Sequence, residues 1–435
     1  MPQRTETLQL QEYETSAPIE LSDETLSAAR MLLSDRVSVI AGDRGGRYMV
    51  KATSWVGTIV LPGLTVRIRP KVADLRNVLM MFGAAGGLAS WGPHEGVYST
   101  DDLVEGIAEL VLREIDAATR RGLVRGYQPR QERVSALRGR LMVEQLATRP
   151  WDVYPAPCEY TDYTADVSEN RVLRAVVRLI QAWALSPSLR RHSLLLLHRL
   201  DEVSDSTTPL LELQTVQRSP VNDHYTAALS LSGLVLTGVG ISHLPGGTSA
   251  LSFLVNMNDL FERWIGAELA ARLWPPVDVV EQANVALSVK PSVPMKPDLL
   301  FKVRGKDRLV GDVKYKLTST GISRNADYYQ LLAYATALRL PRGVLIYCQA
   351  DDAPPREIRV QGGGQTLLCH PLPLNGSPKD VAASLDDLSS TISMWAGVVR
   401  DPLDVADAQV GSRGASQAGA RSTRSPHRPA PLRRG

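Results

Sequence analysis

The residues most able to do chemistry in this chain are two aspartates and a lysine that lie within twenty residues. The segment 297–316 reads PDLLFKVRGKDRLVGDVKYK, with Asp298 near its start and Asp312 and Lys314 near its end. Asp312 and Lys314 are two positions apart in a predicted strand, so their side chains point to the same face. The charged segment 304–307 predicts a turn that folds two strands antiparallel and brings Asp298 toward the pair.

Two carboxylates and an ammonium at one place are the groups that metal-dependent hydrolysis of a phosphodiester requires. The carboxylates would hold Mg²⁺, which neutralises charge on the phosphate and acidifies a bound water. The lysine would position the attacking water and stabilise the developing negative charge. The alternative is an ordinary surface hairpin, because a D-x-K pair is common and alternating charges on an exposed strand are usually just solvated.

Three neighbouring features favour the catalytic interpretation. The residues between the charges are strongly apolar, which predicts central strands, where unpaired charge is expensive. Upstream, a predicted helix places Glu262 among apolar residues. Downstream, another predicted helix carries Gln330 and Tyr334 four positions apart, on one face. For Glu262 and Tyr334 the plain alternatives are a helix-surface charge and a core phenol.

This order of elements, an acidic helix, PD, D-x-K and a helix with Q-x-x-x-Y, resembles the PD-(D/E)xK nuclease superfamily and in particular its RecB-like branch. The resemblance implies that Asp298 and Asp312 are metal ligands and that Lys314 is the catalytic lysine. It also implies that Glu262 is an accessory acid at the metal, while Gln330 orients the site with support from Tyr334.

The elements that must position these residues predict an α/β core in residues 251–404. The hydrophobic pattern predicts, in order, a helix over 251–274, strands near 278–289, 296–303 and 308–316, a helix over 325–338, and strands at 343–349 and 356–360.

The preceding residues divide into a β-rich N-terminal region of α+β type (1–165) and a helical connector (166–250). Apolar and polar residues alternate over 64–69, as in a half-buried strand. The remaining predicted elements are helices over 73–85, 101–121, 166–185 and 187–203, a helical segment in 220–240, and strands in 130–150. Ser168 is a candidate N-cap of its helix, and Asn170 and Arg171 beside it are assigned a structural role.

Composition sets limits on the class of protein. Hydrophobic residues make up 44% and charged residues 22% of the 435 residues, as in an ordinary globular protein, and a net charge of +3 does not by itself indicate nucleic-acid binding. The three cysteines are far apart, which fits a reducing compartment and argues against a zinc site. We find neither a signal peptide nor a membrane span, which predicts a cytoplasmic protein. Residues 405–435 are rich in Ser, Gly, Pro and Arg and predict a disordered basic tail.

A wider resemblance covers most of residues 50–340. Four segments resemble, in order, the McrC family, the nuclease subunit of the McrBC modification-dependent restriction system: VGTIVLPGLTVRIRPKV (56–72), ALRGRL (136–141), TDYTADVSENRVLRAVV (161–177) and MNDLFERWI (257–265). The resemblance implies that the N-terminal region docks on McrB, a ring-forming AAA+ GTPase, and stimulates its nucleotide hydrolysis. It also implies that the C-terminal domain cuts double-stranded DNA whose modified base the partner has recognised.

The chain lacks the G-x-x-x-x-G-K-[ST] phosphate-binding loop, so the expected motor is another chain. We therefore expect a Mg²⁺-dependent DNA endonuclease subunit that works with a AAA+ GTPase or ATPase ring. Two copies would meet at the DNA for a double-strand cut. The alternatives are a stand-alone RecB-like repair nuclease and a non-cleaving activator subunit of a AAA+ GTPase.

Overall fold

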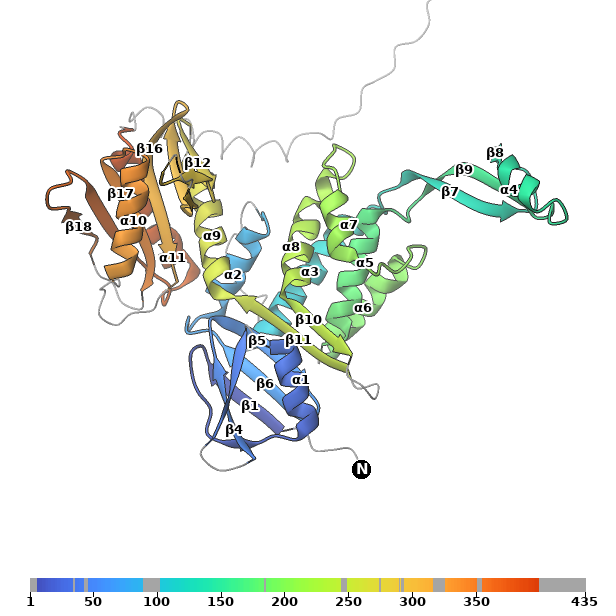
Figure 1. The fold of residues 1–435 in the computed structure, drawn as a ribbon, viewed down its shortest axis with the longest axis horizontal. Coiled ribbons are helices and arrows are strands. Elements are labelled where there is room, and N and C mark those ends of the chain that lie inside the picture. Colours follow the sequence, from blue (N-terminus) through green and yellow to red (C-terminus); the bar gives the residue numbers. More distant parts are fainter. Residues whose placement is uncertain are drawn as a thin grey trace, which may run out of the picture.

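The chain forms an N-terminal sheet region, a helical region with a protruding arm, and a C-terminal α/β region (Figure 1). The predicted mixed α/β architecture is confirmed. The computed structural model describes residues 6–398 apart from 34–35, 43–45, 89–101, 184, 244–248, 274, 289, 291–292, 316–324 and 350–353. The tail predicted over 405–435 lies outside the described residues. No helix in the described part of the chain is long and apolar enough to cross a membrane.

The N-terminal region contains a five-stranded sheet whose strand order includes two strands from much later in the sequence. Leu64, Val66 and Ile68 are buried and the residues between them are not, so the alternation predicted over 64–69 is confirmed. The sheet order is β1 (Glu6–Gln11), β6 (Leu64–Arg69), β5 (Trp55–Leu61), β11 (Ser249–Asn256) and β10 (Val239–His243), with β1 parallel to β6 and the other pairs antiparallel. Beside it lie β2 (Ile19–Glu20), β4 (Arg47–Ala52), β3 (Val37–Ala41) and helix α1 (Asp23–Leu33).

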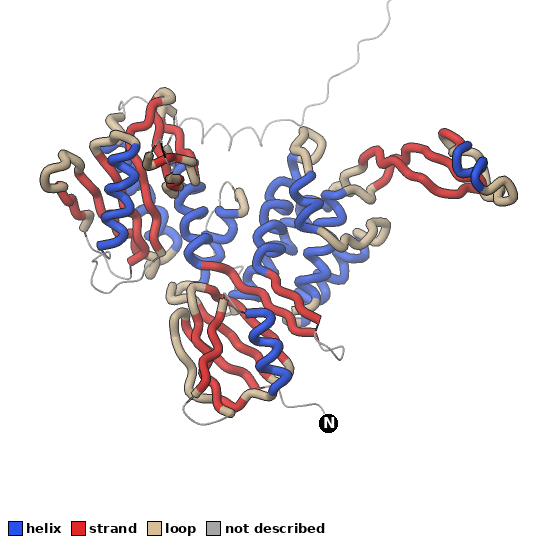
Figure 2. The backbone as a smooth tube through the Cα atoms, viewed as in Figure 1, coloured by secondary structure: helices blue, strands red, loops and turns tan. Residues whose placement is uncertain are grey.

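The helical region packs beside the N-terminal sheet (Figure 2). Each helix predicted in this region is present. In α3 (Leu103–Thr119) the apolar stripe that contains Ile107, Leu110 and Val111 is fully buried, as the 3.6-residue helical period requires. Its helices are α2 (Leu75–Ala85), α3 (Leu103–Thr119), α5 (Ser168–Gln181), α6 (Pro187–Arg199), α7 (Pro209–Thr215), η1 (Asp223–Tyr225) and α8 (Thr226–Gly238).

A three-stranded arm, residues 126–164, extends away from the helical region (Figure 1). It consists of β7 (Gly126–Val134), the short strand β8 (Arg140–Leu141), helix α4 (Val143–Thr148) and β9 (Ala156–Thr164). Strands were predicted throughout 130–150, and this is wrong for α4, which forms a single short helix near the far end of the arm.

One buried side chain holds both ends of the arm at its base. Asn170 is fully buried, and its Nδ2 donates to the carbonyl of Val124 at 2.8 Å and to the carbonyl of Ala165 at 2.7 Å. Val124 precedes β7 and Ala165 follows β9. A single amide therefore fixes the point at which the chain leaves the helical region and the point at which it returns.

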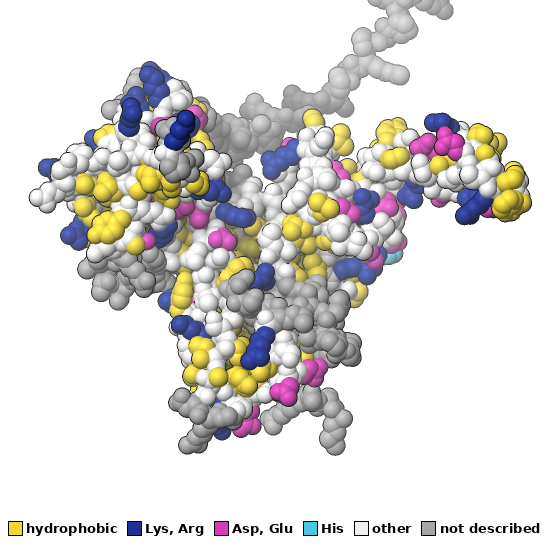
Figure 3. Space-filling model, viewed as in Figure 1, with side chains coloured by type: hydrophobic (Ala, Val, Ile, Leu, Met, Phe, Trp, Pro, Cys, Tyr) yellow, Lys and Arg dark blue, Asp and Glu magenta, His cyan; other side chains and the backbone are white. Residues whose placement is uncertain are grey.

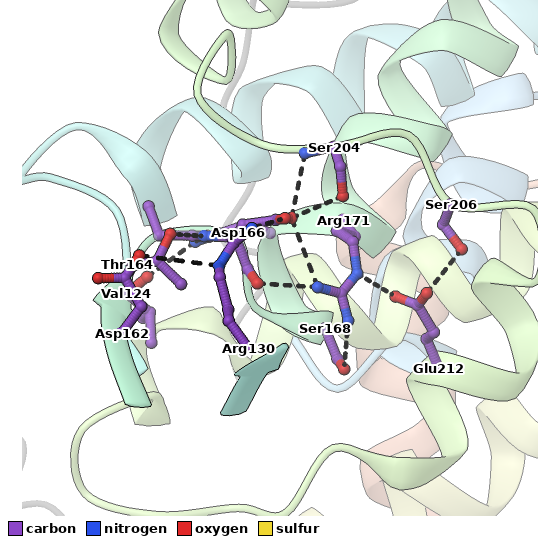
Figure 4. Close-up of polar contacts among 12 residues, drawn as sticks. Val124, Arg130, Asp162, Thr164, Asp166, Ser168, Arg171, Ser204, Ser206 and Glu212 are labelled. Atoms are coloured by element: carbon purple, nitrogen blue, oxygen red, sulfur yellow. Dashed lines mark hydrogen bonds and ion pairs between the residues drawn. The ribbon is translucent and has the colours of Figure 1, made fainter. Parts of the chain in front are cut away.

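Arg171 continues this network on the other side of the arm base (Figure 4). Its Nη1 donates to the carbonyl of Asp166 at 2.8 Å, and its Nε donates to Glu212 Oε2 on α7 at 3.0 Å. The structural role predicted for Asn170 and Arg171 is confirmed, but the predicted N-cap is wrong. The N-cap of α5 is Val167, and Ser168 is its first helical residue, whose hydroxyl accepts from Arg171.

The C-terminal region is a six-stranded sheet with helices on both faces. Helix α10 (Asn325–Ala337) packs against one face of the sheet, and α9 (Met257–Arg272) and α11 (Pro378–Trp395) pack against the other. The order is β12 (Val277–Glu281), β15 (Leu299–Val303), β16 (Lys306–Lys314), β17 (Arg342–Gln349), β19 (Thr366–Pro373) and β18 (Arg356–Arg359), where β16, β17 and β19 are parallel. The helices are α9 (Met257–Arg272), α10 (Asn325–Ala337) and α11 (Pro378–Trp395), and a small hairpin is formed by β13 (Val285–Ala286) and β14 (Pro294–Met295).

The helix predicted over 251–274 is wrong in its first six residues. Residues 249–256 form β11, which pairs with β5 of the N-terminal sheet and buries Phe253 and Leu254. The boundary predicted at 250/251 therefore falls inside a strand. Helix α9 follows β11 without a linker, because Asn256 ends the strand and caps the helix.

Two buried polar contacts also connect the N-terminal and helical parts to the C-terminal region. The hydroxyl of Tyr315, just after β16, donates to Glu12 Oε1 at 3.0 Å. On α2, Asn77 Nδ2 donates to the carbonyls of Leu374 and Gly376, both at 2.8 Å. The regions thus meet through specific hydrogen bonds as well as a shared hydrophobic core.

We predict that Asn170→Ala loosens the arm at its base. The substitution leaves two carbonyls without their donor, and each unpaired buried group costs about 1–3 kcal/mol. The free energy of unfolding should fall by about 2–3 kcal/mol in denaturant titration. Gln131→Ala removes an amide from the exposed face of β7 and should change it by less than about 0.5 kcal/mol. Equal effects of the two substitutions would contradict the assigned role.

We predict that Glu12 makes the fold less stable as the pH rises. Burial raises the pKa of Glu12 from 4.5 to about 7, although hydrogen bonds from Lys71 and Tyr315 lower it. Below the unfolded pKa the carboxyl is protonated in both states. Between the two pKa values only the unfolded chain ionises, so the free energy of unfolding falls by about 3 kcal/mol in all.

Glu12→Gln removes this titration. The variant should match wild type near the lower end of that pH range and be more stable than wild type above its upper end, by at most about 3 kcal/mol. Denaturant unfolding of both proteins across this range measures the difference. Parallel curves for the two proteins would show that Glu12 does not titrate as its burial requires.

Candidate active site

A tight turn and a β-bulge together set the register that brings the candidate catalytic residues together. Arg304 and Gly305 have positive φ values of 51° and 73°, as the two-residue hairpin turn between β15 and β16 requires. The turn predicted over 304–307 is therefore two residues shorter. A β-bulge between Phe301 and Lys302 shifts the pairing by one residue, so Leu299 pairs with Gly311 and, one step further, Asp298 lies opposite Asp312.

The structure brings Asp298, Asp312 and Lys314 into one charged cluster. Lys314 Nζ lies 3.0 Å from Asp312 Oδ1 and 2.9 Å from its Oδ2, and 3.8 Å from Asp298 Oδ2. Asp298 Oδ2 also accepts from the backbone N–H of Val313 at 2.7 Å. The predicted convergence of two carboxylates and an ammonium is therefore present in the structure.

Burial dominates the electrostatics of the cluster. Asp312 has no exposed surface, and burial together with the charge of Asp298 raises its pKa to about 7, against the lowering effect of Lys314. Burial alone would lower the pKa of Lys314, but the charges of Asp312 and Asp298 outweigh it and raise this pKa. The two carboxylates thus favour the ammonium form, and the ammonium only partly offsets the cost of burying them.

Glu262 lies close enough to this cluster to respond to its charge. Burial first, and then the charges of Asp298 and Asp259, raise the pKa of Glu262 to about 7. Its Oε1 accepts a hydrogen bond from Gln282 Nε2, and the backbone N–H of Gln282 donates to the carbonyl of Asp298 at 2.9 Å. Gln282 therefore connects α9 to the start of β15, a role that the sequence did not indicate.

Helix α10 places Gln330 and Tyr334 on one face, as predicted. Gln330 Nε2 donates to the hydroxyl of Tyr334 at 2.8 Å, and that hydroxyl lies 3.4 Å from the carbonyl of Lys296. Burial raises the pKa of Tyr334, and the charges of Asp312 and Asp298 contribute to the rise, so the phenol lies near the cluster. Gln330 is exposed and reaches the site through Tyr334.

Asp327, in the first turn of α10, is a further acid that the sequence analysis did not single out. It is buried, and its charge contributes to the raised pKa of Lys314. An acid in the first turn of a helix is an ordinary helix-start signal, so its type and position gave no separate indication of a place near the cluster.

The donor set fits Mg²⁺. In the described part of the chain no three His, Cys, Asp or Glu side chains are grouped as a complete metal site. Mg²⁺ does not require one, because it is usually held by one or two carboxylates together with waters and substrate phosphates. Asp312 Oδ2 is buried, and Lys314 Nζ lies 2.9 Å from it without the geometry of a hydrogen bond; a cation bound at this oxygen would share it with the ammonium.

Comparison with solved structures shows the fold. The chain is 18% identical, with a TM-score of 0.56, to a chain in a refined half-complex from the tetradecameric assembly of Thermococcus gammatolerans McrB AAA+ hexamers with bound McrC, covering 89% of this chain and 100% of that one. A chain of the cryo-EM structure of the Thermococcus gammatolerans McrBC complex is 19% identical, with a TM-score of 0.41, over 62% of this chain and 88% of that one. Comparison with curated proteins gave no match.

A sequence profile described as McrBC 5-methylcytosine restriction system component matches residues 50–348. This span includes four of the five strands of the N-terminal sheet (β5, β6, β10 and β11), the arm, the helical region and the Asp298–Asp312–Lys314 cluster. Because the match covers more than half of the sequence, the chain belongs to the family of McrBC 5-methylcytosine restriction system components.

Proposed function

We propose that the chain is the nuclease subunit of a McrBC-type restriction system, a Mg²⁺-dependent DNA endonuclease that a AAA+ GTPase ring activates and whose NTP hydrolysis it stimulates. The observation that carries the proposal is the cluster of Asp298, Asp312 and Lys314 at the end of one hairpin. The C-terminal region would then be a PD-(D/E)xK core. The succession of α9, the β15–β16 hairpin, α10 and β17 supports this assignment.

In this proposal Asp298 and Asp312 hold Mg²⁺, and Glu262 is the accessory acid. The bound ion would neutralise charge on the scissile phosphate and lower the pKa of the attacking water. The ammonium of Lys314 donates to a phosphate oxygen and stabilises the negative charge that develops there. Tyr334, fixed by Gln330, keeps α10 against the segment that leads into Asp298.

Two observations support a AAA+ partner. The chain belongs to the family of McrBC restriction system components, and its fold is similar to that of a chain in an assembly of McrB AAA+ hexamers with bound McrC. The N-terminal region would dock on such a ring. Two copies of the C-terminal region would meet at the DNA, because a double-strand cut requires two active sites. The modified base would be recognised by the partner, since the chemistry identified in this chain is that of cleavage.

The arm offers a surface for this partner. Figure 3 shows hydrophobic side chains at its far end. Trp151 is 81% exposed and Tyr154 71% exposed, and large aromatic side chains with this exposure are typical anchors of protein interfaces. The other exposed apolar residues of the arm are Tyr127, Leu137, Val143, Val153 and Tyr163.

We expect Asp312→Asn to abolish cleavage and leave the partner's NTP hydrolysis stimulated. The substitution removes one of two metal-binding carboxylates, so the cleavage rate with partner, NTP and Mg²⁺ should fall by at least about 100-fold. Asp307→Asn is the matched control on the same strand, because Asp307 pairs with Lys302 at 3.4 Å, away from the site. It should cleave like wild type.

The same assay separates the alternatives. Stimulation by wild type without any cleavage would favour a non-cleaving activator, and cleavage without the partner would favour a stand-alone nuclease. Cleavage that needs the partner but survives Asp312→Asn would exclude the proposed site.

We expect the double substitution Trp151→Ala with Tyr154→Ala to weaken binding to the AAA+ ring. Truncation of an aromatic anchor costs about 2 kcal/mol or more, so the concentration needed for half-maximal stimulation should rise about 30-fold or more. The paired control Leu194→Ala with Leu195→Ala removes two exposed leucines from α6, 53% and 61% exposed. A larger loss with this control would place the partner on α6.

A further inference from the structure

One hydrogen bond joins the N-terminal sheet to the strand that bears Lys314. Glu12 follows β1 and is 2% exposed, and its Oε1 accepts from the hydroxyl of Tyr315 at 3.0 Å. The same oxygen accepts from the backbone N–H of Lys71 at 3.0 Å, and the backbone N–H of Glu12 donates to the carbonyl of Arg69 at 3.0 Å. Both the backbone and the carboxylate of Glu12 are therefore fixed to the end of β6.

Tyr315 links the strand that carries Lys314 to the helix that carries Glu262. It is the residue after Lys314, and its ring packs against Phe261, the residue before Glu262, at 5.8 Å between ring centroids. Strand alternation directs Tyr315 toward α9, and Lys314 toward the opposite face with Asp312. The Tyr315 side chain thus contacts α9, the helix that carries Glu262. Its backbone directly follows Lys314, the last residue of β16.

The end of β16 needs such a contact. The pairing of β16 with β17 ends at Lys314, opposite Tyr347, and its pairing with β15 ends at Gly311. Lysine has a long flexible side chain, so the location of its ammonium depends on the location of its backbone. Displacement of a catalytic group by about 1 Å can cost about 100-fold in rate.

We propose that Glu12 is a positioning residue for the active site, which holds Lys314 in place through the hydrogen bond from Tyr315. This inference rests on the proposed nuclease function. It assigns a part in cleavage to a residue of the N-terminal region, 303 positions away in sequence from the tyrosine that it contacts.

Stability alone does not account for an acid at this position. Glu12 Oε2 is buried and accepts no hydrogen bond from any described residue. Burial raises the pKa of Glu12 to about 7, so its ionisation opposes folding at higher pH. Glu12 supplies a carboxylate oxygen that the backbone N–H of Lys71 holds in place and that accepts the hydrogen bond from the Tyr315 hydroxyl.

Asn77 provides a matched control. Its Nδ2 also makes buried hydrogen bonds to the C-terminal region, at Leu374 and Gly376, and these lie after β19 and not on β16. Asn77→Ala therefore loosens another buried contact of the C-terminal region without touching the strand that carries Lys314.

The test compares Tyr315→Phe, Glu12→Leu, Glu12→Gln and Asn77→Ala in the full chain. Single-turnover DNA cleavage is measured with the AAA+ partner at saturating Mg²⁺, and stimulated NTP hydrolysis and thermal unfolding are measured on the same samples. Tyr315→Phe and Glu12→Leu should cleave about 10-fold more slowly with unchanged NTP hydrolysis. Glu12→Gln retains the accepting oxygen and should cleave at the wild-type rate, as should Asn77→Ala below its unfolding temperature.

A second measurement does not depend on cleavage. The rate of acylation of Lys314 in the metal-free chain is followed by mass spectrometry. In wild type the ammonium is held between two carboxylates and should react slowly, and Tyr315→Phe should raise its rate several-fold while Asn77→Ala does not.

The outcomes are distinct. Wild-type cleavage and acylation in Tyr315→Phe would overturn the positioning role, and so would equal losses in Tyr315→Phe and Asn77→Ala, which would reflect a loosened interface in general. Absence of cleavage by wild type would contradict the proposed function, and the acylation rates would still decide whether the hydrogen bond from Tyr315 to Glu12 fixes Lys314.

Discussion

The burial of three charges at the end of one hairpin is the constraint on which the rest of the C-terminal region depends. Asp312 is fully buried, and two carboxylates with one ammonium leave an excess of negative charge in apolar surroundings. Such charges are costly unless each is paired and hydrogen-bonded, so the backbone must be fixed closely enough to keep Lys314 between the carboxylates. The tight turn at Arg304 and Gly305, the central position of β16 and the bond from Val313 to Asp298 meet that requirement. A divalent cation, as proposed, would offset the remaining negative charge.

The helix that bears Glu262 is built directly on the N-terminal sheet. Asn256 is the last residue of β11 and the N-cap of α9; its side chain accepts from the backbone N–H of Asn258 at 3.1 Å and from the Ser54 hydroxyl at 3.2 Å. The backbone N–H of Met257 donates to the carbonyl of Ser54 at 2.9 Å. No linker separates sheet and helix, so a displacement of the sheet displaces α9. Glu262, the proposed accessory acid, therefore takes its position from the N-terminal region, whereas Asp298 and Asp312 take theirs from the hairpin.

The sequence predicted those parts of the fold and site that depend on local pattern. Strand alternation placed Asp312 and Lys314 on one face, and helical spacing placed Gln330 and Tyr334 on another. Residues 251–256 were misassigned because a short apolar run suits helix and strand equally, and its pairing with β5 decides the outcome. Helices α1 and α11 and strand β19 were not identified either. Gln282 and Glu12 were missed for a different reason: their partners are distant in sequence, so no local pattern marks them.

The arm and the proposed active site are connected by an unbroken series of packed helices and paired strands. Asn170 fixes the arm to the start of α5, α5 packs against α8, and α8 continues without a linker into β10, the neighbour of β11. A stiff connection by itself transmits no regulation, because a ligand shifts an equilibrium only by the difference in its affinity for the two states. A partner that held the arm equally well throughout its nucleotide cycle would therefore leave Lys314 and Glu262 unaffected. Activation of cleavage through these elements requires that the partner's affinity for the arm change with its nucleotide state. The conformational change would then begin in the proposed AAA+ ring, and its effect on cleavage would appear in this chain.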